Sequence, residues 1–392
     1  MASDAMLSPG LALLPPYALS AIEIDLWIVQ DNYHILQKFL KDSGSSQTIC
    51  GSVVKANAYG AGVLSVGKTL VAAGCHDFFV ADIDEALHLR AVVPEGRIFV
   101  FSGVLPESTA LFSEQGFIPI LLHREQILDW HKEAQHLGQK LPAVLHIDTG
   151  MSRTGLMGKD IDWLLENREL LAAFSLQYLL SHLSCSSDRS APFNDIQRKR
   201  FLSFRQYFPT VPASFAASEG ITLGKAYHFD SVRPGKFLLG LGEPIIPGLR
   251  PAIRVYGRVL EVADVALGQS VGYEGSYTFK HPGRVAVLGI GYADGIPRAT
   301  GNRGVVKIKG QSALITGYVS MDYTSVDITE VKEEVRPGDW AILVDENLSM
   351  ENMAQYVGTI SRETCCTLGA RPYRLYRCGE TYTVHPPFSK SL

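Results

Sequence analysis

The chain has 392 residues, of which 46% are apolar and 19% charged, and its formal net charge is −4. This length favours two domains with a large buried core, and the composition is that of a globular protein. The absence of any run of five like charges argues against a nucleic-acid-binding surface, and the absence of an apolar run of roughly 18 residues argues against a membrane-spanning segment.

The first 20 residues contain a short apolar stretch that no Lys or Arg precedes. A secretory signal requires a basic segment ahead of its apolar segment. We therefore expect residues 1–20 to form a disordered or loosely packed tail.

Short apolar runs alternate with amphipathic, helix-like stretches from about residue 50 to residue 240. The runs are rich in Val, Ile, Leu and Phe without strict alternation, which is typical of strands buried on both faces of a parallel sheet. The candidate strands are 51–54, 78–81, 98–101, 118–121, 143–147 and 177–182.

The stretches between these strands show helical spacing of apolar residues. Ile127, Trp130 and Ala134 recur at this spacing, and Gly138 is a plausible C-terminal stop; three phenylalanines repeat the pattern at positions 201, 204 and 208. No G-x-G-x-x-G motif opens a helix after the first strand, so a (β/α)₈ barrel over residues 21–248 fits better than a dinucleotide-binding sheet.

The pattern changes near residue 248, where closely spaced strand signals begin. They are 253–262, 276–279, 284–290, 304–308 and 313–315, and Gly, Pro, Asn and Asp separate them. These breaks predict a second domain over residues 249–392 that is mostly antiparallel β structure.

Six cysteines occur, at positions 50, 75, 185, 365, 366 and 378, and no two of them form a C-x-x-C pair. This spacing fits neither a zinc cluster nor a disulfide framework. We interpret them as reduced thiols of a cytoplasmic protein, and we expect no bound metal.

Lys55 follows the first candidate strand directly. A lysine that is desolvated at the end of a buried strand loses its proton easily and can form a Schiff base with a carbonyl group. The apolar-Lys-Ala pattern alone favours the other interpretation, a lysine at the barrel rim that pairs with a carboxylate.

The string VVKANAYGAG at residues 53–62 resembles the cofactor-lysine motif of the alanine racemase family. Five further strings resemble that family's signatures and occur in the same order: HIDTGMSRTG at 146–155, SVRPG at 231–235, VGY at 271–273, GYADG at 291–295 and SMD at 320–322. Each string alone is weak evidence, but six in order, within residues 22–376, indicate membership of this family of pyridoxal-phosphate enzymes.

The resemblance implies an enzyme that racemises a small amino acid, with alanine as the expected substrate and D-alanine for peptidoglycan as the expected product. Lys55 would bind pyridoxal 5′-phosphate and act as the base on one face of the substrate. Tyr273 would serve the other face from the second subunit of a homodimer. A tyrosine hydroxyl is a weak acid, so such a base requires positive charge or hydrogen-bond donors nearby. Judged by its sequence context alone, Tyr273 is better explained by packing in the β domain.

Arg233 would face the pyridine nitrogen of the cofactor. An arginine donates hydrogen bonds, cannot accept them and keeps its proton, so it holds that nitrogen unprotonated and weakens the electron sink. This arrangement disfavours transamination. Without the resemblance, Arg233 reads as a residue of a surface salt bridge.

The resemblance also assigns the remaining contacts. The phosphate would be bound by the hydroxyl groups of Tyr59 and Ser218 and the backbone amides of Gly235 and Lys236, since backbone amides near a helix start form phosphate sites. His182 would lie beside the cofactor ring, although a lone His after an apolar run is as often a core residue. Two further sets complete the assignment: Arg153 would bind the phenolic oxygen and contact the substrate, while the pocket lining would include Tyr292, Met321 and Asp322.

Several positions depart from the family pattern. His146 replaces a lysine that is common two residues before the aspartate, Ala217 replaces an asparagine, and Lys236 replaces an aliphatic residue. An entrance tyrosine of some members corresponds to Ala370. These changes leave the two expected proton-transfer residues in place and bear mainly on substrate choice.

Four other readings are compatible with parts of the pattern. A racemase of broader specificity, acting on serine, keeps the same fold and mechanism. A decarboxylase on the same two-domain plan would carry a Gly-Gly-Gly phosphate loop, which is absent, and Arg233 argues against it. A cofactor carrier without turnover would resemble the barrel alone, and a non-catalytic barrel would bind no coloured cofactor.

Overall fold

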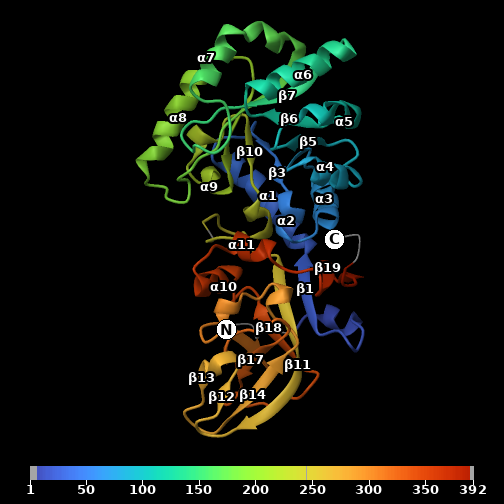
Figure 1. Cartoon of the computed structure of the whole chain (residues 1–392), viewed down its shortest axis with the longest axis vertical. Coiled ribbons are helices and arrows are strands. Elements are labelled where there is room, and N and C mark those ends of the chain that lie inside the picture. The colour runs from blue at the N-terminus through green and yellow to red at the C-terminus, as the bar shows by residue number, and fades with distance from the viewer. Residues whose placement is uncertain (1–6, 244, 389–392) are drawn as a thin grey trace.

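The computed structural model describes residues 7–243 and 245–388, which form two lobes joined end to end (Figure 1). The upper lobe in this view is a barrel and the lower lobe is built on a second sheet. Two short helices, α10 (Met350–Val357) and α11 (Ser361–Cys366), lie where the lobes meet. In the described part of the chain, no helix is long and apolar enough to cross a membrane.

The barrel is a ring of parallel strands in the order β2-β10-β9-β8-β7-β6-β5-β4-β3. Their bounds are β2 Ile49–Cys50, β3 Ser52–Val53, β4 Asp77–Val80, β5 Arg97–Val100, β6 Ile118–Leu121, β7 Leu141–His146, β8 Phe174–Leu180, β9 Ala213–Ala217 and β10 Ser231–Arg233. β2 and β3 are consecutive parts of one stretch around Gly51, and they pair with the two ends of the sheet. The ring therefore closes, which confirms the expected (β/α)₈ architecture.

Helices connect and cover these strands. They are α1 Leu26–Asp42, α3 Val63–Ala72, α4 Ile83–Arg90, α5 Thr109–Gln115, α6 Arg124–Leu137, α7 Lys159–Glu166, α8 Pro192–Arg205 and α9 Ser218–Ile221. α6 buries Ile127, Trp130 and Ala134, and it ends at Gly138, whose φ of 62° is left-handed. The helical spacing in the sequence thus predicts both the buried face and the end of this helix.

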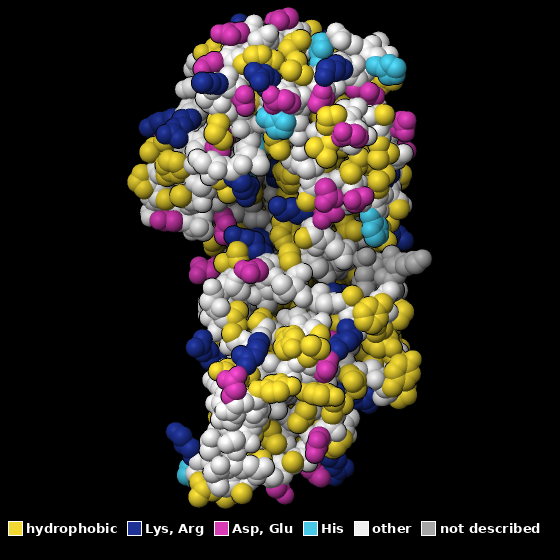
Figure 2. All heavy atoms as spheres, in the orientation of Figure 1, with side chains coloured by type: hydrophobic (Ala, Val, Ile, Leu, Met, Phe, Trp, Pro, Cys, Tyr) yellow, Lys and Arg dark blue, Asp and Glu magenta, His cyan; other side chains and the backbone are white. Residues whose placement is uncertain are grey.

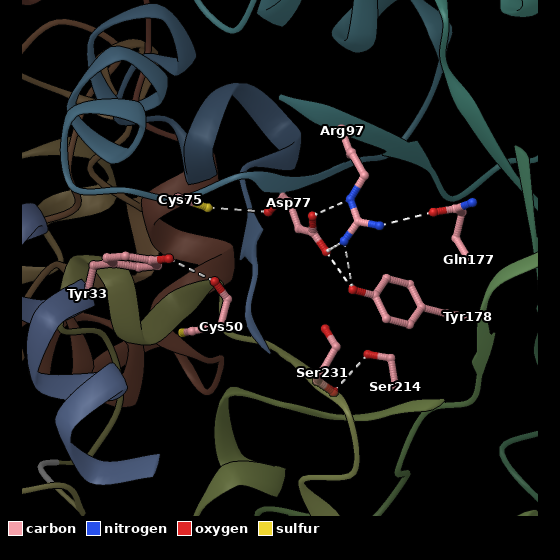
Figure 3. A network of polar contacts seen from close by, with 9 residues as sticks. All are labelled: Tyr33, Cys50, Cys75, Asp77, Arg97, Gln177, Tyr178, Ser214 and Ser231. Carbon is pink, nitrogen blue, oxygen red and sulfur yellow. Dashed lines mark hydrogen bonds and ion pairs between the residues drawn. The ribbon is translucent and has the colours of Figure 1, made fainter. Parts of the chain in front are cut away.

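Apolar side chains of six barrel strands fill the interior: Val53, Phe79, Phe99, Ile118, Ile120, Val144, Tyr178 and Leu180. A polar network lies at the N-terminal ends of β4 and β5 (Figure 3). Asp77 receives two hydrogen bonds of 2.7 Å from the Arg97 guanidinium and one of 2.7 Å from the Tyr178 hydroxyl. Because Asp77 is only 1% exposed, these bonds compensate a buried charge at this end and leave the opposite end of the barrel for a site.

The second lobe contains a nine-stranded sheet in the order β14-β17-β16-β15-β18-β11-β1-β19-β20. Its strands are β1 Ser20–Asp25, β11 Ile253–Val265, β14 Gly283–Leu288, β15 Val305–Ile308, β16 Gln311–Ile315, β17 Thr324–Asp327, β18 Trp340–Val344, β19 Tyr373–Cys378 and β20 Thr381–His385. A separate hairpin joins β12 (Ser270–Val271) to β13 (Tyr277–Thr278). Within the described residues, every strand pair of this sheet except β1–β19 is antiparallel, which confirms a mostly antiparallel domain.

The N-terminal part of the chain differs from the expectation. β1 pairs with β11 and β19 and so belongs to the sheet of the second lobe, although it precedes the barrel in sequence. Residues 8–14 are not a loose tail: a 3₁₀ turn, η1 (Pro9–Leu13), buries Leu11, and Leu14 is buried beside it. Part of the apolar stretch that was expected to belong to a loose tail is therefore packed in the core of the second lobe. Residues 1–6 of the expected tail lie outside the described residues. The expected division near residue 248 falls in the connection that leads into β11.

Candidate active site

A cavity of about 510 Å³ opens at the C-terminal ends of the barrel strands. Lys55 follows β3, His146 ends β7 and Arg233 ends β10, and all three side chains line the cavity. Figure 2 shows Lys and Arg side chains around a hollow between the two lobes. The cavity has the volume of a small-molecule site and the position at which barrel enzymes carry their chemistry.

The turn that carries Lys55, labelled α2 (Lys55–Tyr59), has an unusual backbone. Four consecutive residues, 56 to 59, have φ between 52° and 56°, which is the left-handed region. Glu85 fastens this turn, because its carboxylate accepts hydrogen bonds from the backbone of Ala56 at 2.6 Å and of Ala81 at 2.7 Å. A left-handed run of non-glycine residues is strained, and such strain is concentrated at functional sites.

The Lys55 amine lies 5.5 Å from the centre of the Phe101 ring. Burial lowers the pKa of Lys55, and the positive charge of Arg153 lowers it further. A larger fraction of this amine is therefore neutral near pH 7 than for an exposed lysine, which favours attack on a carbonyl carbon and uptake of a proton.

Tyr59, Ser218 and Gly235 form a corner of the cavity wall that contains hydroxyl and amide groups, which we call the donor corner. The amide of Gly235 donates to the Ser218 hydroxyl at 3.0 Å. A Cβ atom on residue 235 would lie 2.1 Å from the Tyr59 hydroxyl oxygen, so only glycine allows this approach. Burial raises the pKa of Tyr59, which keeps its phenol protonated as a hydrogen-bond donor. Lys236 lines the same wall, and its amine forms an ion pair with Glu219.

Arg233 is only 1% exposed, and among the described residues its guanidinium contacts neutral groups. It donates to the Ser214 hydroxyl at 2.6 Å and to the Ser181 carbonyl at 2.7 Å, and it packs 6.0 Å from the centre of the Phe79 ring. Burial lowers the pKa of Arg233 to about 9, so the side chain is still a cation near pH 7. It is held rigidly as a donor at the cavity wall.

Two imidazoles border Arg233. Burial, together with the charge of Arg233, lowers the pKa values of both His146 and His182 to about 3. Both rings are consequently neutral at physiological pH. The backbone carbonyl of His182 accepts a hydrogen bond of 3.0 Å from Gln197 in α8, which fixes the segment after β8.

Arg153 lies on an exposed loop whose backbone Asp148 organises. The carboxylate of Asp148 accepts hydrogen bonds from the amides of Gly150 at 2.6 Å, Met151 at 2.8 Å and Arg153 at 3.1 Å. This explains the aspartate of the D-T-G segment as a structural residue. The loop presents the Arg153 side chain to the same cavity as Lys55.

The structure does not bring the C-terminal candidates into this cavity. Tyr273 is 64% exposed, Tyr292 is 44% exposed and Met321 is 53% exposed, and none of them lines the cavity of its own barrel. Asp322 is partly exposed and pairs with Arg371 at 2.5 Å. Their side chains are therefore open to solvent within the single chain.

Arg371 connects the two loops that carry these candidates. Its guanidinium binds both carboxylate oxygens of Asp294, at 2.7 and 2.8 Å, as well as Asp322 and the Met321 carbonyl. Sequence reasoning missed Arg371, because nothing in its local context distinguishes it from a surface arginine.

Sequence reasoning also missed Arg362, which reaches the cavity from α11 of the second lobe. Its charge and the neighbouring Cys366 thiol both act on the pKa of Lys55. A single arginine in the string TISRETCC gives no periodic or motif signal, so only the packing of the two lobes reveals it.

The site combines an amine of lowered pKa, the donor corner and a buried arginine. These features suit a flat, anionic molecule with a reactive carbonyl group. All six cysteines are free, and no three His, Cys, Asp or Glu side chains converge as a metal site within residues 7–243 and 245–388.

Comparison with known proteins gives a consistent result. The family model described as "Alanine racemase, N-terminal domain" matches residues 24–243, and "Alanine racemase, C-terminal domain" matches residues 252–376. The alanine racemase of Rhodospirillum rubrum is 38% identical over 364 residues, covering 92% of this chain and 96% of that protein. The alanine racemase of Rickettsia conorii is 36% identical over 361 residues, covering 92% of this chain and 99% of that protein.

Two solved structures are similar to the chain. One is alanine racemase from Bartonella henselae with covalently bound pyridoxal phosphate, with a TM-score of 0.87 and 35% identity over 92% of this chain and all of that chain. The other is biosynthetic alanine racemase from Pseudomonas aeruginosa, with a TM-score of 0.84 and 29% identity over the same shares.

Proposed function

The chain belongs to the alanine racemase family, and from this premise we propose that it interconverts L-alanine and D-alanine with pyridoxal 5′-phosphate bound in the cavity. The observation that carries the proposal is the placement of Lys55. Its amine, with a lowered pKa, lines one cavity with the donor corner and a buried arginine donor.

The residues of the cavity fit the cofactor group by group. Lys55 would hold the aldehyde carbon, while the hydroxyl groups of Tyr59 and Ser218 and the amides of Gly235 and Lys236 would bind the phosphate. Arg233 would donate to the pyridine nitrogen. Arg153 would bind the phenolic oxygen, and His182 would lie beside the ring. When bound, pyridoxal 5′-phosphate withdraws electrons from the substrate α-carbon and so stabilises the carbanion formed by loss of its proton.

Two bases on opposite faces move the α-proton in this proposal. Lys55 Nζ removes or returns the proton on one face. Tyr273 Oη of the partner subunit does so on the other face, which requires a homodimer. The 64% exposure of Tyr273 and its distance from its own cavity support this arrangement, because an inward-facing base would be buried in its own chain.

Arg233 would limit side reactions. An arginine keeps its proton, so Arg233 would leave the pyridine nitrogen unprotonated, and the bound cofactor would be a weaker electron sink than one whose nitrogen a carboxylate keeps protonated. A weaker electron sink would favour racemisation over transamination.

Three residues of the second lobe would complete the substrate pocket in the dimer, namely Tyr292, Met321 and Asp322. The Asp322 carboxylate is paired with Arg371, so its role is to position Met321 rather than to repel the carboxylate of the substrate. Arg153 would contact that carboxylate as well as the cofactor. The D-alanine product would serve peptidoglycan synthesis in the cytoplasm, where six free thiols remain reduced.

Purified protein mixed with L-alanine in deuterated water tests the proposal. We expect loss of the α-proton signal together with loss of optical activity. In the Lys55→Ala variant, we expect the rates of both processes to fall about a thousand-fold or more. L-serine is the parallel substrate, and faster racemisation of serine would assign a broader specificity. A yellow protein that exchanges the α-proton of neither amino acid would contradict the two-base mechanism.

A further inference from the structure

Arg362 is a positive charge on the cavity wall to which the proposed mechanism gives no role. It lies in α11 and lines the cavity with Lys55, Tyr59 and Ser218. Across the described ranges, 7–243 and 245–388, its guanidinium forms no ion pair and donates no hydrogen bond. A guanidinium with five donors and no acceptor on a cavity wall is suited to an anionic ligand.

α11 packs directly on the turn that carries Lys55 and Tyr59. The Cys365 thiol donates to the backbone carbonyl of Tyr59 at 3.0 Å. A Cβ atom on residue 60 would lie 2.5 Å from the Cys365 carbonyl oxygen, so the contact of α11 with Gly60 leaves no space for a side chain. The backbone of Arg362 is thus held in a fixed position relative to the donor corner.

The charge of Arg362 acts on both side chains that point from this turn. It opposes the rise that burial causes in the pKa of Tyr59, and it adds to the lowering of the Lys55 pKa. The guanidinium therefore lies close enough to influence both the amine and the phenol.

Among the described residues of the corner around Tyr59, no other side chain offers a free positive charge. The Tyr59 and Ser218 hydroxyl groups and the Gly235 amide are neutral donors. The cation of Lys236 is already paired with the Glu219 carboxylate. A phosphate monoester carries between one and two negative charges near pH 7, and neutral donors alone leave that charge uncompensated in a partly desolvated site.

We propose that Arg362 binds the phosphate group of the cofactor and supplies the positive charge that the barrel does not. The inference rests on the proposed function. It means that the second lobe of the same chain takes part in holding the cofactor, and that removal of this charge weakens binding of phosphate-bearing ligands in particular.

Titration of the cofactor-free full-length chain with pyridoxal 5′-phosphate and with pyridoxal, followed by absorbance, tests this inference. For Arg362→Met we expect a Kd for pyridoxal 5′-phosphate that rises about ten- to a hundred-fold, the size of a lost charged hydrogen bond. The Kd for pyridoxal, which lacks the phosphate, should stay within about two-fold of wild type. Arg362→Lys should give an intermediate effect, and Arg168→Met, at an exposed arginine outside the cavity, should give none.

An unchanged Kd for pyridoxal 5′-phosphate in Arg362→Met would overturn the inference. A rise confined to the KM for alanine would also overturn it, by assigning Arg362 to the substrate carboxylate. Equally weaker binding of pyridoxal 5′-phosphate and of pyridoxal would also overturn the inference, because it would reflect a general disturbance of the cavity. If wild-type protein itself binds no pyridoxal 5′-phosphate, the proposed function fails along with this inference, whereas normal wild-type binding confines the failure to Arg362.

Discussion

His146 is a buried side chain whose ionisation opposes folding. It is 6% exposed, and burial together with the charge of Arg233 lowers its pKa to about 3. An unfolded histidine has a pKa near 6.5. Below that pH, His146 is protonated in the unfolded chain and stays neutral in the folded chain. The resulting loss of stability begins as the pH falls below about 6.5 and is complete near pH 3.

From this we expect the free energy of unfolding to fall by about 2 kcal/mol more between pH 7 and pH 5 in wild type than in a His146→Asn variant. Urea unfolding at the two pH values measures the difference. His281→Asn, at an exposed histidine of the second lobe, is the matched control, and its free energy of unfolding should depend on pH as that of wild type does. An identical pH dependence in His146→Asn and wild type would contradict the neutral assignment of His146.

Lys55 and His182 lie next to apolar runs that the sequence marks as strands, whereas Arg233 is indicated only by the family resemblance. All three side chains line one cavity, and the roles expected for them there stay predictions. Arg362 could not be predicted, since its place depends on the contact of α11 with a turn about 300 positions earlier in the chain. The second-lobe candidates, such as Tyr273, lie outside the cavity of their own chain, and their roles stay predictions.

The left-handed turn α2 is the element that aims Lys55 and Tyr59. Ala56 is exposed and has a φ of 52°, where an alanine Cβ is strained and glycine is not. Ala110 is exposed in the right-handed helix α5 and provides the opposite case.

We expect Ala56→Gly to leave the free energy of unfolding unchanged or to raise it by up to about 1 kcal/mol, because relief of strain offsets the extra freedom of the unfolded chain. Ala110→Gly should lower it by about 0.5–1 kcal/mol. Denaturant unfolding of the two variants compares these effects, and a similar loss in both would argue against a left-handed conformation at Ala56.

Elements formed by local signals were predicted well, and those formed by distant pairing were not. The strand β6 (Ile118–Leu121) coincides with its predicted range, and it lies within an apolar run that extends from residue 117 to residue 122. β1 lies in the second lobe between strands from residues after 250, and no signal within it indicates those partners. The helices α10 and α11 lie beyond residue 315, where the strand signals found in the second domain end, and they were not predicted.

At the scale of the whole molecule, the two lobes of one chain hold complementary parts of the expected machinery. The barrel contributes Lys55, whereas Tyr273 lies on an exposed part of the second lobe. The comparisons confirm the family and the class of enzyme, but they do not place the two residues in one site. A symmetric dimer would contain two such sites, each with Lys55 from one chain and Tyr273 from the other.

Mixing of two inactive variants tests this shared site. We expect the racemase activity of Lys55→Ala alone and of Tyr273→Phe alone to be about a hundred- to ten-thousand-fold or more below that of wild type, because each variant lacks one proton-transfer group. After subunit exchange, half of the dimers are mixed, and each mixed dimer has one site with an intact lysine and an intact tyrosine. Racemase activity should therefore recover to about a quarter of the wild-type value. A mixture of Lys55→Ala with the double variant has no such site and should stay inactive. If the first mixture also stays inactive while mass spectrometry shows mixed dimers, both groups must act within one chain, and Tyr273 would have to reach its own barrel by a movement of the lobes.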